Sequence, residues 1–373
     1  MGLGGEQRVV QDLAVMRGPD VFVEVWSLRD RELPGVAERL EEAGVPYRTM
    51  GFSGTAFFAA VGLRRRLLAL RPDIVHVHLE YSTLVGALAV QSLPTPWPIL
   101  VASVANDPHR QSVFHRLAGR QLAPSFGAHI THSRGIEEAV RRAYAGRHRR
   151  IHGVSLGIDL RRCDKSYAVA ARVAEYRRGA GCVVGTMGRL VPQKAMHVLL
   201  DATPALLQAD PRTRVLIVGD GPLRSALEAQ AHALGIADAV TFAGYQEDVA
   251  SAYAAMDVFV LPSRDEGFGL VFLEAMAIVV PVVGTRVIGS EDAVDDGVTG
   301  LLVSYADDQA LASAVRRLLT EPGLAPRLRR TASERVRRLY SRDRFAAQVE
   351  TIYRELIETA APARLLRPAA LGI

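Results

Sequence analysis

The residues whose types and spacing best suit chemistry lie in one glycine-rich segment, which runs from Ser263 to Ala277. It passes from the end of a predicted strand through a loop into a helix that should begin near Leu270. Free amides at a helix N-terminus attract anions, and the two glycines of the loop would let a ligand approach the backbone closely. Glu266 and Glu274 add carboxylates that can accept hydrogen bonds from sugar hydroxyls. The residues predicted to bind are Glu266, Gly267, Phe268, Gly269, Leu270, Val271 and Glu274.

A second candidate lies where a predicted strand is followed by Gly188, Arg189 and, five residues later, Lys194. Arginine grips two oxygens at once and lysine supplies a point charge, so this pair of cations suits a diphosphate. In open α/β sheets, ligands bind at the carboxyl ends of the strands. Cations also commonly flank helix starts without binding anything, and the spacing alone leaves both interpretations open.

The turn Gly219-Asp220-Gly221 also follows a predicted strand and invites comparison with dinucleotide-binding fingerprints. The third glycine of that fingerprint would fall at position 224, where the chain has Arg224, and no suitable acidic residue follows at the right distance. A nicotinamide or flavin cofactor is therefore not expected. The turn still predicts a close approach of the backbone at Gly219, most simply to a nucleotide.

These loops need elements to hold them, and strand and helix patterns alternate along the whole chain. Such alternation is typical of parallel sheets with crossover helices. Strands are predicted at 21–26, 74–78, 99–104, 129–132, 151–154, 182–187, 214–218, 240–243, 258–261 and 280–283. A final helical stretch runs from Ser341 to about Ala361 and is followed by an apolar tail that contains arginines.

At 373 residues the chain is long enough for two cores of ordinary size. The predicted fold is α/β, with an N-terminal Rossmann-like domain at 1–165 and a second at 166–345. Residues 346–373 form a C-terminal helix and tail. No stretch of 18 apolar residues is present to span a membrane, and the start lacks the pattern of a secretory signal. Two cysteines, Cys163 and Cys182, make no disulfide framework, and together with these features they favour a cytoplasmic protein.

The positive charge is concentrated in the first half of the chain. Residues 1–165 carry 22 Lys and Arg against 16 Asp and Glu, whereas the remainder carries 23 against 24. Arginines cluster at 64–66, at 141–142 and at 147–150. These clusters are either solvated helix faces or a surface that meets anionic lipid or an anionic acceptor. Nucleic acid is not expected as a partner, because no aromatic residues alternate with the arginines.

The first domain lacks an expected element at its start. A doubly wound domain normally begins with a strand, a glycine turn and a helix, but here the chain begins at the turn Gly2-Leu3-Gly4-Gly5. The expectation from the sequence is that the start codon is placed too late or that the protein is truncated.

Several motifs in one order resemble family 4 of the retaining glycosyltransferases. The most specific are the run from Glu266 to Ala277, then Pro281-Val282-Val283, then the run from Asp296 to Val303. Similar matches extend over almost the whole chain: Gly4 to Val10, Pro72 to His78, Gly157 to Asp159, Gly188-Arg189 with Lys194, and Gly219 to Pro222.

The resemblance implies the GT-B fold, in which two Rossmann-like domains face each other and the last helix crosses back to the first domain. It implies that Arg189 and Lys194 neutralise the donor diphosphate, and that Glu266 contacts the transferred sugar. Glu274 would bind the ribose, and the base would lie near Tyr245 and Gln246. Gly4 and Gly5 would belong to the donor site as well. The implied reaction needs no metal or other cofactor and uses a UDP- or GDP-linked sugar as substrate, with a lipid-linked or saccharide acceptor.

The sequence departs from the family pattern at several positions besides the missing strand. Many relatives carry a histidine beside the reacting sugar, where this chain has Ala105; Asn106 or His109 is the expected substitute. A usual glycine is replaced by Val279, and a usual double glycine reads Ile288-Gly289. These changes predict altered geometry around the donor.

Two histidines, His76 and His78, alternate with valines on one predicted strand. One is expected to face the cleft, which makes His78 an acceptor-side candidate, and the other a helix layer. The default expectation for either histidine is a structural role with its hydrogen bonds satisfied. Two further interpretations remain open. One is a catalytically impaired GT-B protein that acts as a binding or scaffolding partner in glycan synthesis. The other is a GT-B sugar-nucleotide epimerase, which the loop at Glu266 argues against.

Overall fold

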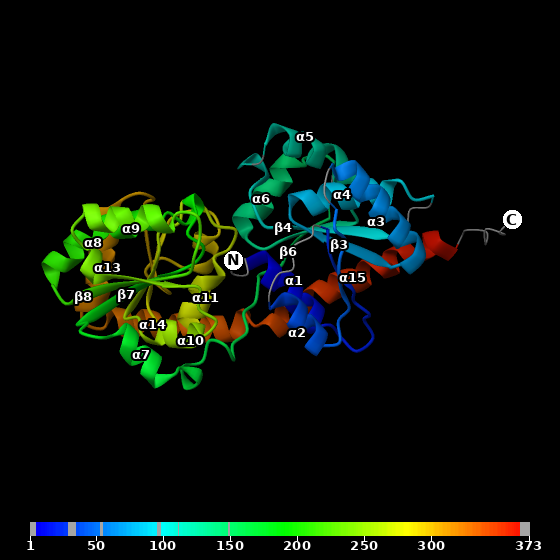
Figure 1. Cartoon of the computed structure of the whole chain (residues 1–373). Coiled ribbons are helices and arrows are strands. Elements are labelled where there is room, and N and C mark those ends of the chain that lie inside the picture. The colour runs from blue at the N-terminus through cyan, green and yellow to red at the C-terminus, as the bar shows by residue number, and fades with distance from the viewer. Residues whose placement is uncertain are drawn as a thin grey trace. The chain divides into compact units, whose positions relative to one another are not determined.

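The computed structural model describes residues 5–28, 35–52, 55–94, 98–110, 112–147 and 150–365. The chain divides into two compact units. Figure 1 shows the chain coloured by residue number from blue to red. The N-terminal unit comprises residues from Gly5 to Ser155 together with the segment from Asp343 onward, and the C-terminal unit runs from Leu156 to Arg342. Both divisions lie earlier in the chain than the boundaries predicted after residues 165 and 345.

The C-terminal unit is built on one six-stranded parallel sheet with the order β12-β11-β10-β7-β8-β9. Its first strand, β7, lies between β8 and β10, so the strand order reverses there, at the topological switch point of a Rossmann-like sheet. The strands are β7 (Cys182–Met187), β8 (Thr213–Val218), β9 (Val240–Gly244), β10 (Val258–Leu261), β11 (Val282–Thr285) and β12 (Leu301–Val303). The helices are α7 (Ala170–Tyr176), α8 (Met196–Ala209), α9 (Arg224–Ala233), α10 (Val249–Ala254), α11 (Leu270–Ala277), α12 (Ser290–Ala293), α13 (Asp308–Thr320) and α14 (Leu324–Leu339).

The apolar sequences of these strands explain why the sheet is enclosed. Every residue of β7, β10 and β11 is buried, as expected for a parallel sheet that helices cover on both faces. Phe259 of β10 packs edge-to-face against Phe272 of α11, with ring centroids 6.0 Å apart. This packing holds α11, and the loop that precedes it, against the sheet.

The N-terminal unit contains a four-stranded parallel sheet with the order β3-β4-β5-β6 and a separate parallel pair, β1-β2. The strands are β1 (Val25–Ser27), β2 (Tyr47–Thr49), β3 (Ile74–His78), β4 (Ile99–Val104), β5 (Ala128–Thr131) and β6 (Ile151–Gly153). The helices are α1 (Gly5–Val15), α2 (Val36–Glu42), α3 (Ala56–Leu70), α4 (Glu80–Gln91), α5 (Val113–Leu122) and α6 (Arg134–Ala143). Within this unit, α3, α4 and α5 lie on one side of the sheet (Figure 1).

The last helix, α15 (Arg342–Leu365), packs on the N-terminal unit against the other face of its sheet. The Tyr353 hydroxyl lies 2.5 Å from Nδ1 of His76 on β3. The ring of Phe345 packs against His132, and the Glu350 carboxylate accepts a hydrogen bond from the amide of Gly18. The prediction that the C-terminal helix crosses back to the first domain is therefore confirmed.

The predicted α/β class with two Rossmann-like domains is also confirmed, and β3, β4, β7 and β10 occupy their predicted ranges. The sequence missed β2 and β12, because strands of three residues carry too short a pattern. The strand predicted at 280–283 begins later than expected, because β11 starts at Val282. The amide of Val280 instead bonds to the carbonyl of Ala275 and closes α11.

Candidate functional site

The predicted donor residues of the C-terminal unit gather around its topological switch point. Lys194 lies in the loop after β7, and Glu266 lies in the loop after β10, the neighbouring strand. Two backbone-anchored contacts join the loops: the amide of Arg264 bonds to the carbonyl of Gln193, and the Gln193 side chain donates to the carbonyl of Asp265 at 3.2 Å. The sheet thus brings together two segments that are far apart in the sequence.

Lys194 and Glu266 form an ion pair at the meeting point of these loops. The ammonium nitrogen lies 2.5 Å from Oε1 of Glu266, and the side chains are only 18% and 5% exposed. The Ser263 hydroxyl donates a second hydrogen bond to the same carboxylate oxygen, at 2.6 Å. A carboxylate held by two donors in an enclosed place keeps one orientation, which a ligand-binding group requires.

Arg189 differs from Lys194 in being exposed. Within the described residues, its guanidinium forms no ion pair with any carboxylate. Its charge is therefore available to an anion from solution, whereas Lys194 must share its charge with Glu266. Arginine grips a phosphate through two parallel hydrogen bonds, so this position suits the predicted diphosphate.

The glycines of the Gly219-Asp220-Gly221 turn pack against protein backbone. A Cβ on Gly219 would lie 2.0 Å from the carbonyl oxygen of Gly188, and one on Gly221 would lie 2.5 Å from that of Leu190. The turn at Gly219 therefore packs closely against the preceding loop of the same unit, and its approach to a nucleotide stays a prediction. Glycine is required at both positions for the turn to pack this closely against the loop that carries Arg189.

The loop before α11 has the geometry that the sequence suggested. Gly269 caps the helix with φ +82°, a left-handed conformation that favours glycine. Leu270 and Val271 open the helix and are half-buried, whereas Phe268 is buried and packs against Tyr340. Gly289 lies against this loop, since a Cβ there would be 2.7 Å from the carbonyl oxygen of Glu266.

Glu274 is buried on α11 and accepts a hydrogen bond of 2.8 Å from the Tyr253 hydroxyl. Tyr253 lies on α10 and was not predicted, because no motif surrounds it in the sequence.

The base-binding candidates differ from each other in exposure and in their existing hydrogen bonds. Tyr245 is 48% exposed, whereas Gln246 is already held by Ala243 and Arg172 through hydrogen bonds of 2.6 and 3.2 Å.

The predicted glycine turn of the N-terminal unit is described only in part. Gly4 lies outside the described residues, and Gly5 is the first residue of α1. Gly5 belongs to the N-terminal unit, whereas the remaining donor candidates belong to the C-terminal unit.

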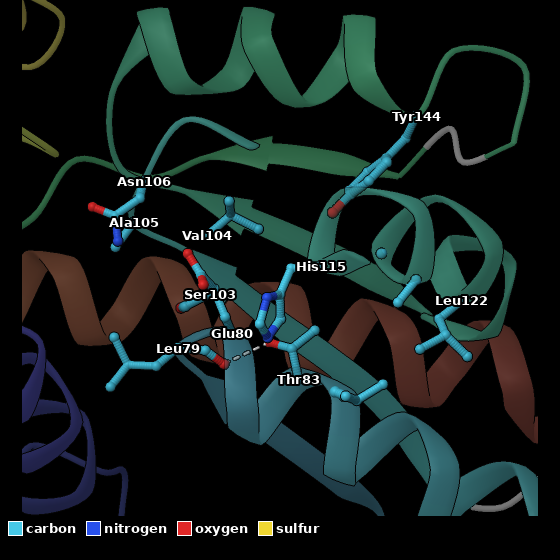
Figure 2. Close-up of a pocket in the computed structure, with 13 residues that line it drawn as sticks. Leu79, Glu80, Thr83, Ser103, Val104, Ala105, Asn106, His115, Leu122 and Tyr144 are labelled. Carbon is cyan, nitrogen blue, oxygen red and sulfur yellow. Dashed lines mark hydrogen bonds between the residues drawn. The ribbon is translucent and has the colours of Figure 1, made fainter. Parts of the chain in front are cut away.

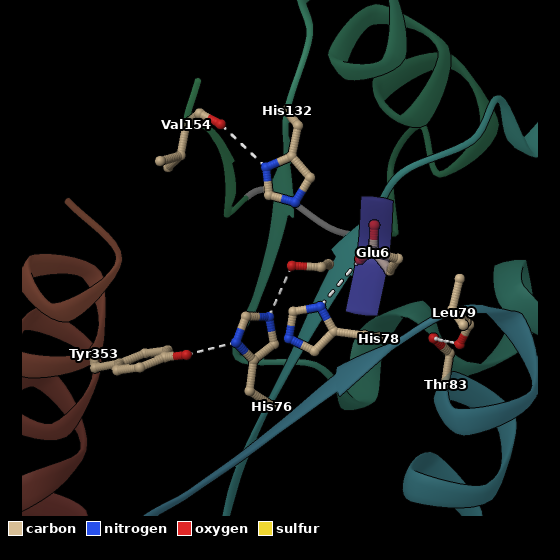
Figure 3. Close-up of polar contacts among 9 residues, drawn as sticks. Glu6, His76, His78, Leu79, Thr83, His132, Val154 and Tyr353 are labelled. Carbon is tan, nitrogen blue, oxygen red and sulfur yellow. Dashed lines mark hydrogen bonds and ion pairs between the residues drawn. The ribbon is translucent and has the colours of Figure 1, made fainter. Parts of the chain in front are cut away.

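The prediction that His76 and His78 face opposite sides of the sheet was wrong. Their rings lie on the same face with centroids 4.2 Å apart, because residues two apart on a strand point to the same side. His76 bonds to Tyr353 and to the Ser103 hydroxyl, and His78 pairs with the Glu6 carboxylate at 3.1 Å (Figure 3).

His132 completes this cluster from the end of β5. Its Nδ1 lies 3.1 Å from the carbonyl of Val154, while its buried Nε2 has no hydrogen-bond partner among the described residues. Burial lowers the pKa of His132, and it lowers the pKa of His76 well below the ordinary value. The pKa of Glu6 is also lowered; burial opposes this shift, and the hydrogen bond and charge of His78 outweigh it. Within the described residues, no three such side chains converge as a metal site would require.

A pocket opens at the carboxyl ends of β3 and β4, on the face covered by α4, α5 and the end of α6 (Figure 2). Asn106 lines it, as does Ala105, whereas His109 is exposed on a neighbouring turn and does not. Three of its polar residues, Glu80, His115 and Tyr144, were not predicted from the sequence. Glu80 lies on α4, His115 on α5 and Tyr144 directly after α6, and only the fold brings them together.

Comparison with known families gives two matches that lie one in each unit. Residues 3–162 match the model described as Glycosyltransferase Family 4, and residues 181–321 match that of Glycosyl transferases group 1. A D-inositol 3-phosphate glycosyltransferase of Saccharomonospora viridis is 32% identical over 368 residues, covering 92% of this chain and 82% of the relative. A GDP-mannose-dependent phosphatidylinositol monomannoside mannosyltransferase of Mycolicibacterium smegmatis is 38% identical over a shorter stretch, 44% of this chain and 46% of that protein.

Solved structures share the architecture of the whole chain. The Anabaena protein HepE in complex with UDP-glucose aligns with a TM-score of 0.80 at 22% identity, covering 96% of both chains. A sucrose-phosphate synthase of Thermosynechococcus elongatus aligns with a TM-score of 0.77 at 23% identity, covering 95% of this chain and 94% of that one. At such identities the likeness is one of fold.

Proposed function

We propose that this chain, which belongs to glycosyltransferase family 4 and has the GT-B fold, transfers a hexosyl group from a nucleotide sugar with retention of configuration. The donor is a nucleotide diphosphate sugar and the acceptor is a hydroxyl group of a lipid-linked molecule or a saccharide. The observation that carries the proposal is the Lys194–Glu266 pair, which lies at the switch point of the C-terminal sheet beside the start of α11.

In the proposed donor complex, the diphosphate lies against Arg189, Lys194 and the first amides of α11. Glu266 accepts hydrogen bonds from the transferred sugar. Glu274 binds the ribose, which requires it to share or exchange its bond with Tyr253. The exposed ring of Tyr245 and the neighbouring Gln246 flank the base.

The proposed reaction is a front-face displacement. The bond between the anomeric carbon and the diphosphate oxygen breaks, and the acceptor oxygen forms a bond on the same face of the sugar. The acceptor proton passes to the departing diphosphate oxygen. Arg189 and Lys194 stabilise the negative charge that develops there, and we propose on this ground that the protein needs no metal or other cofactor.

Donor binding is testable because the chain has only two lysines, Lys165 and Lys194. If the diphosphate contacts Lys194, UDP or GDP should slow acylation of Lys194 by an amine-reactive reagent several-fold and leave that of Lys165 unchanged. Mass spectrometry of the labelled peptides measures both lysines in one sample. The better nucleotide should also raise the melting temperature. Equal labelling of Lys194 with and without either nucleotide would contradict the proposed site.

Turnover is tested separately with Glu266→Gln, which keeps the size of the side chain and removes its charge. Loss of one preorganised electrostatic group typically lowers kcat about 100- to 1,000-fold. Glu321→Gln, on an exposed i,i+4 pair with Arg317, is the matched control. A wild-type protein that binds nucleotide but transfers no sugar to any acceptor would instead favour the scaffolding role.

We further propose that the protein binds peripherally to the cytoplasmic face of the cell membrane. The observation is a set of exposed apolar side chains on α3 and α5, two helices that both pack against α4. They are Phe57, Phe58, Val61, Val113, Phe114 and Leu117. Arg65 and Arg66 on α3 form no ion pair within the described residues, and anionic lipid would complement them. Among those residues, no helix has the length and apolar character needed to cross a bilayer.

A further inference from the structure

The pocket of the N-terminal unit lies outside the predicted donor residues of the C-terminal unit. It is lined by the end of β4, the start of α4, one side of α5 and Tyr144 at the end of α6 (Figure 2). The carboxyl edge of a parallel sheet is where α/β proteins bind ligands. Apolar walls with a few convergent polar groups are typical of small-molecule sites.

The polar groups in this pocket suit hydroxyl groups. Figure 2 shows the Glu80 carboxylate, the His115 ring and the Tyr144 hydroxyl around the same space, with Asn106 lining its edge. Carboxylates accept hydrogen bonds, amides donate and accept them, and the phenol does both. The His115 ring is steadied by the Ser112 hydroxyl, which lies 2.8 Å from Nδ1. Such a set can engage several hydroxyls of one ring.

The charge of the pocket is unsuited to a phosphate. None of the lining residues is lysine or arginine: they are Leu79, Glu80, Thr83, Leu84, Ser103, Val104, Ala105, Asn106, His115, Ala118, Gly119, Leu122 and Tyr144. The pKa of Tyr144 is raised by burial and, secondarily, by the negative charge of Glu80, so this carboxylate influences groups on the other side of the pocket. A phosphate placed here would meet a negative field with no cation among the lining side chains.

We infer that this pocket binds the acceptor through an uncharged polyol or sugar ring, and that Glu80 disfavours phosphorylated acceptors. The inference rests on the proposed glycosyl transfer and specifies its acceptor. It sets this chain apart from the Saccharomonospora viridis relative, whose name gives D-inositol 3-phosphate as substrate.

The test compares matched pairs of probes with and without phosphate: myo-inositol against D-inositol 3-phosphate, and methyl α-glucoside against its 6-phosphate. Binding to the full-length protein is measured by ligand-observed NMR at pH 8. At least one neutral probe should bind about tenfold more tightly than its phosphorylated partner, since each like charge near Glu80 weakens binding by a few-fold. The preference should shrink at high salt, because an exposed carboxylate is screened.

Glu80→Gln should narrow the ratio within each pair, and Glu138→Gln on α6, a carboxylate that does not line the pocket, should leave it unchanged. The inference is overturned if the phosphorylated probes bind as tightly as the neutral ones, if neither neutral probe binds, or if Glu80→Gln leaves the ratio unaltered. UDP and GDP binding is measured in the same samples. Loss of nucleotide binding would contradict the proposed transferase, whereas a wrong charge preference alone would contradict only the acceptor inference.

Discussion

At the scale of single residues, Val279 shows how a departure from the family pattern is accommodated. α11 ends in a Schellman motif, in which the amide of Val280 bonds to Ala275 and that of Val279 bonds to Met276. The residue at the centre of this motif takes a left-handed conformation and is usually glycine. Val279 adopts it with φ +68°, which is strained for a β-branched side chain.

Val279→Gly should therefore stabilise the C-terminal unit. Relief of the left-handed strain contributes about 1–2 kcal/mol, and the added freedom of glycine in the unfolded chain offsets roughly half of it. The side chain is 37% exposed, so little packing is lost. Thermal unfolding should show a rise of a few degrees, with Val298→Gly, another exposed valine of this unit, as the control. A lower melting temperature for Val279→Gly would contradict this account of the strain.

The sequence identified residues well where a motif surrounded them. It paired Lys194 and Glu266 with one donor site, and the fold indeed joins them across two neighbouring strands. Tyr253, Glu80 and His115 escaped notice because each lies on a helix with no local signature. Their positions are set by packing between segments distant in the chain, which no local pattern records.

At the scale of elements, α3 combines two roles that its sequence shows only in part. Leu63 and Leu67 are buried against α4, and the opposite face presents Phe57, Phe58 and Arg65 to solvent. In the sequence, the only sign of a membrane-binding surface is the set of arginine clusters. The structure separates them, since Arg141 and Arg142 are paired with glutamates on their own helix while Arg65 is not.

The membrane proposal is tested at this scale by sedimentation with lipid vesicles. The wild-type protein should bind vesicles that contain anionic lipid, more weakly at high salt, and should bind neutral vesicles poorly. Replacing Phe57 and Phe58 together by serine should weaken binding about tenfold or more, since each buried phenylalanine contributes on the order of 1 kcal/mol or more. Phe22→Ser, an exposed aromatic residue on no helix, is the control. Equal binding to anionic and neutral vesicles would refute the proposal.

At the scale of the whole molecule, the buried histidines predict how stability depends on pH. His76 and His132 have lowered pKa values in the folded state, so the folded protein holds them neutral. Above about pH 6.5, the ordinary value for histidine, their contribution to stability is complete. Below it the unfolded chain takes up protons that the folded chain refuses, and stability falls by up to about 1.4 kcal/mol per pH unit for each histidine.

The melting temperature should therefore decline between pH 7 and pH 5. His132→Phe should reduce this decline, because it removes one of the titrating rings; loss of the Nδ1 contact with the Val154 carbonyl should lower the melting temperature at both pH values. His197→Asn, at an exposed position of α8, should not. Glu6 acts in a separate and more acidic window, since its lowered pKa gives a contribution that is lost only as the pH falls below about 4.5. A melting temperature that stays constant from pH 7 to pH 5 would show that these rings are not kept neutral by the fold.

Because α15 packs on the N-terminal unit, the order of synthesis on the ribosome affects when each unit can complete its folding. Among the described residues, the C-terminal unit is one continuous stretch, whereas the N-terminal unit is completed by a segment that is synthesised after the C-terminal unit. The sheet face that carries His76 and His132 is covered only after α15 has been synthesised, because Tyr353 and Phe345 of that helix contact these two histidines. The N-terminal unit can therefore complete its folding only after the C-terminal unit has been synthesised, and truncation of the chain before α15 would leave this face of its sheet uncovered.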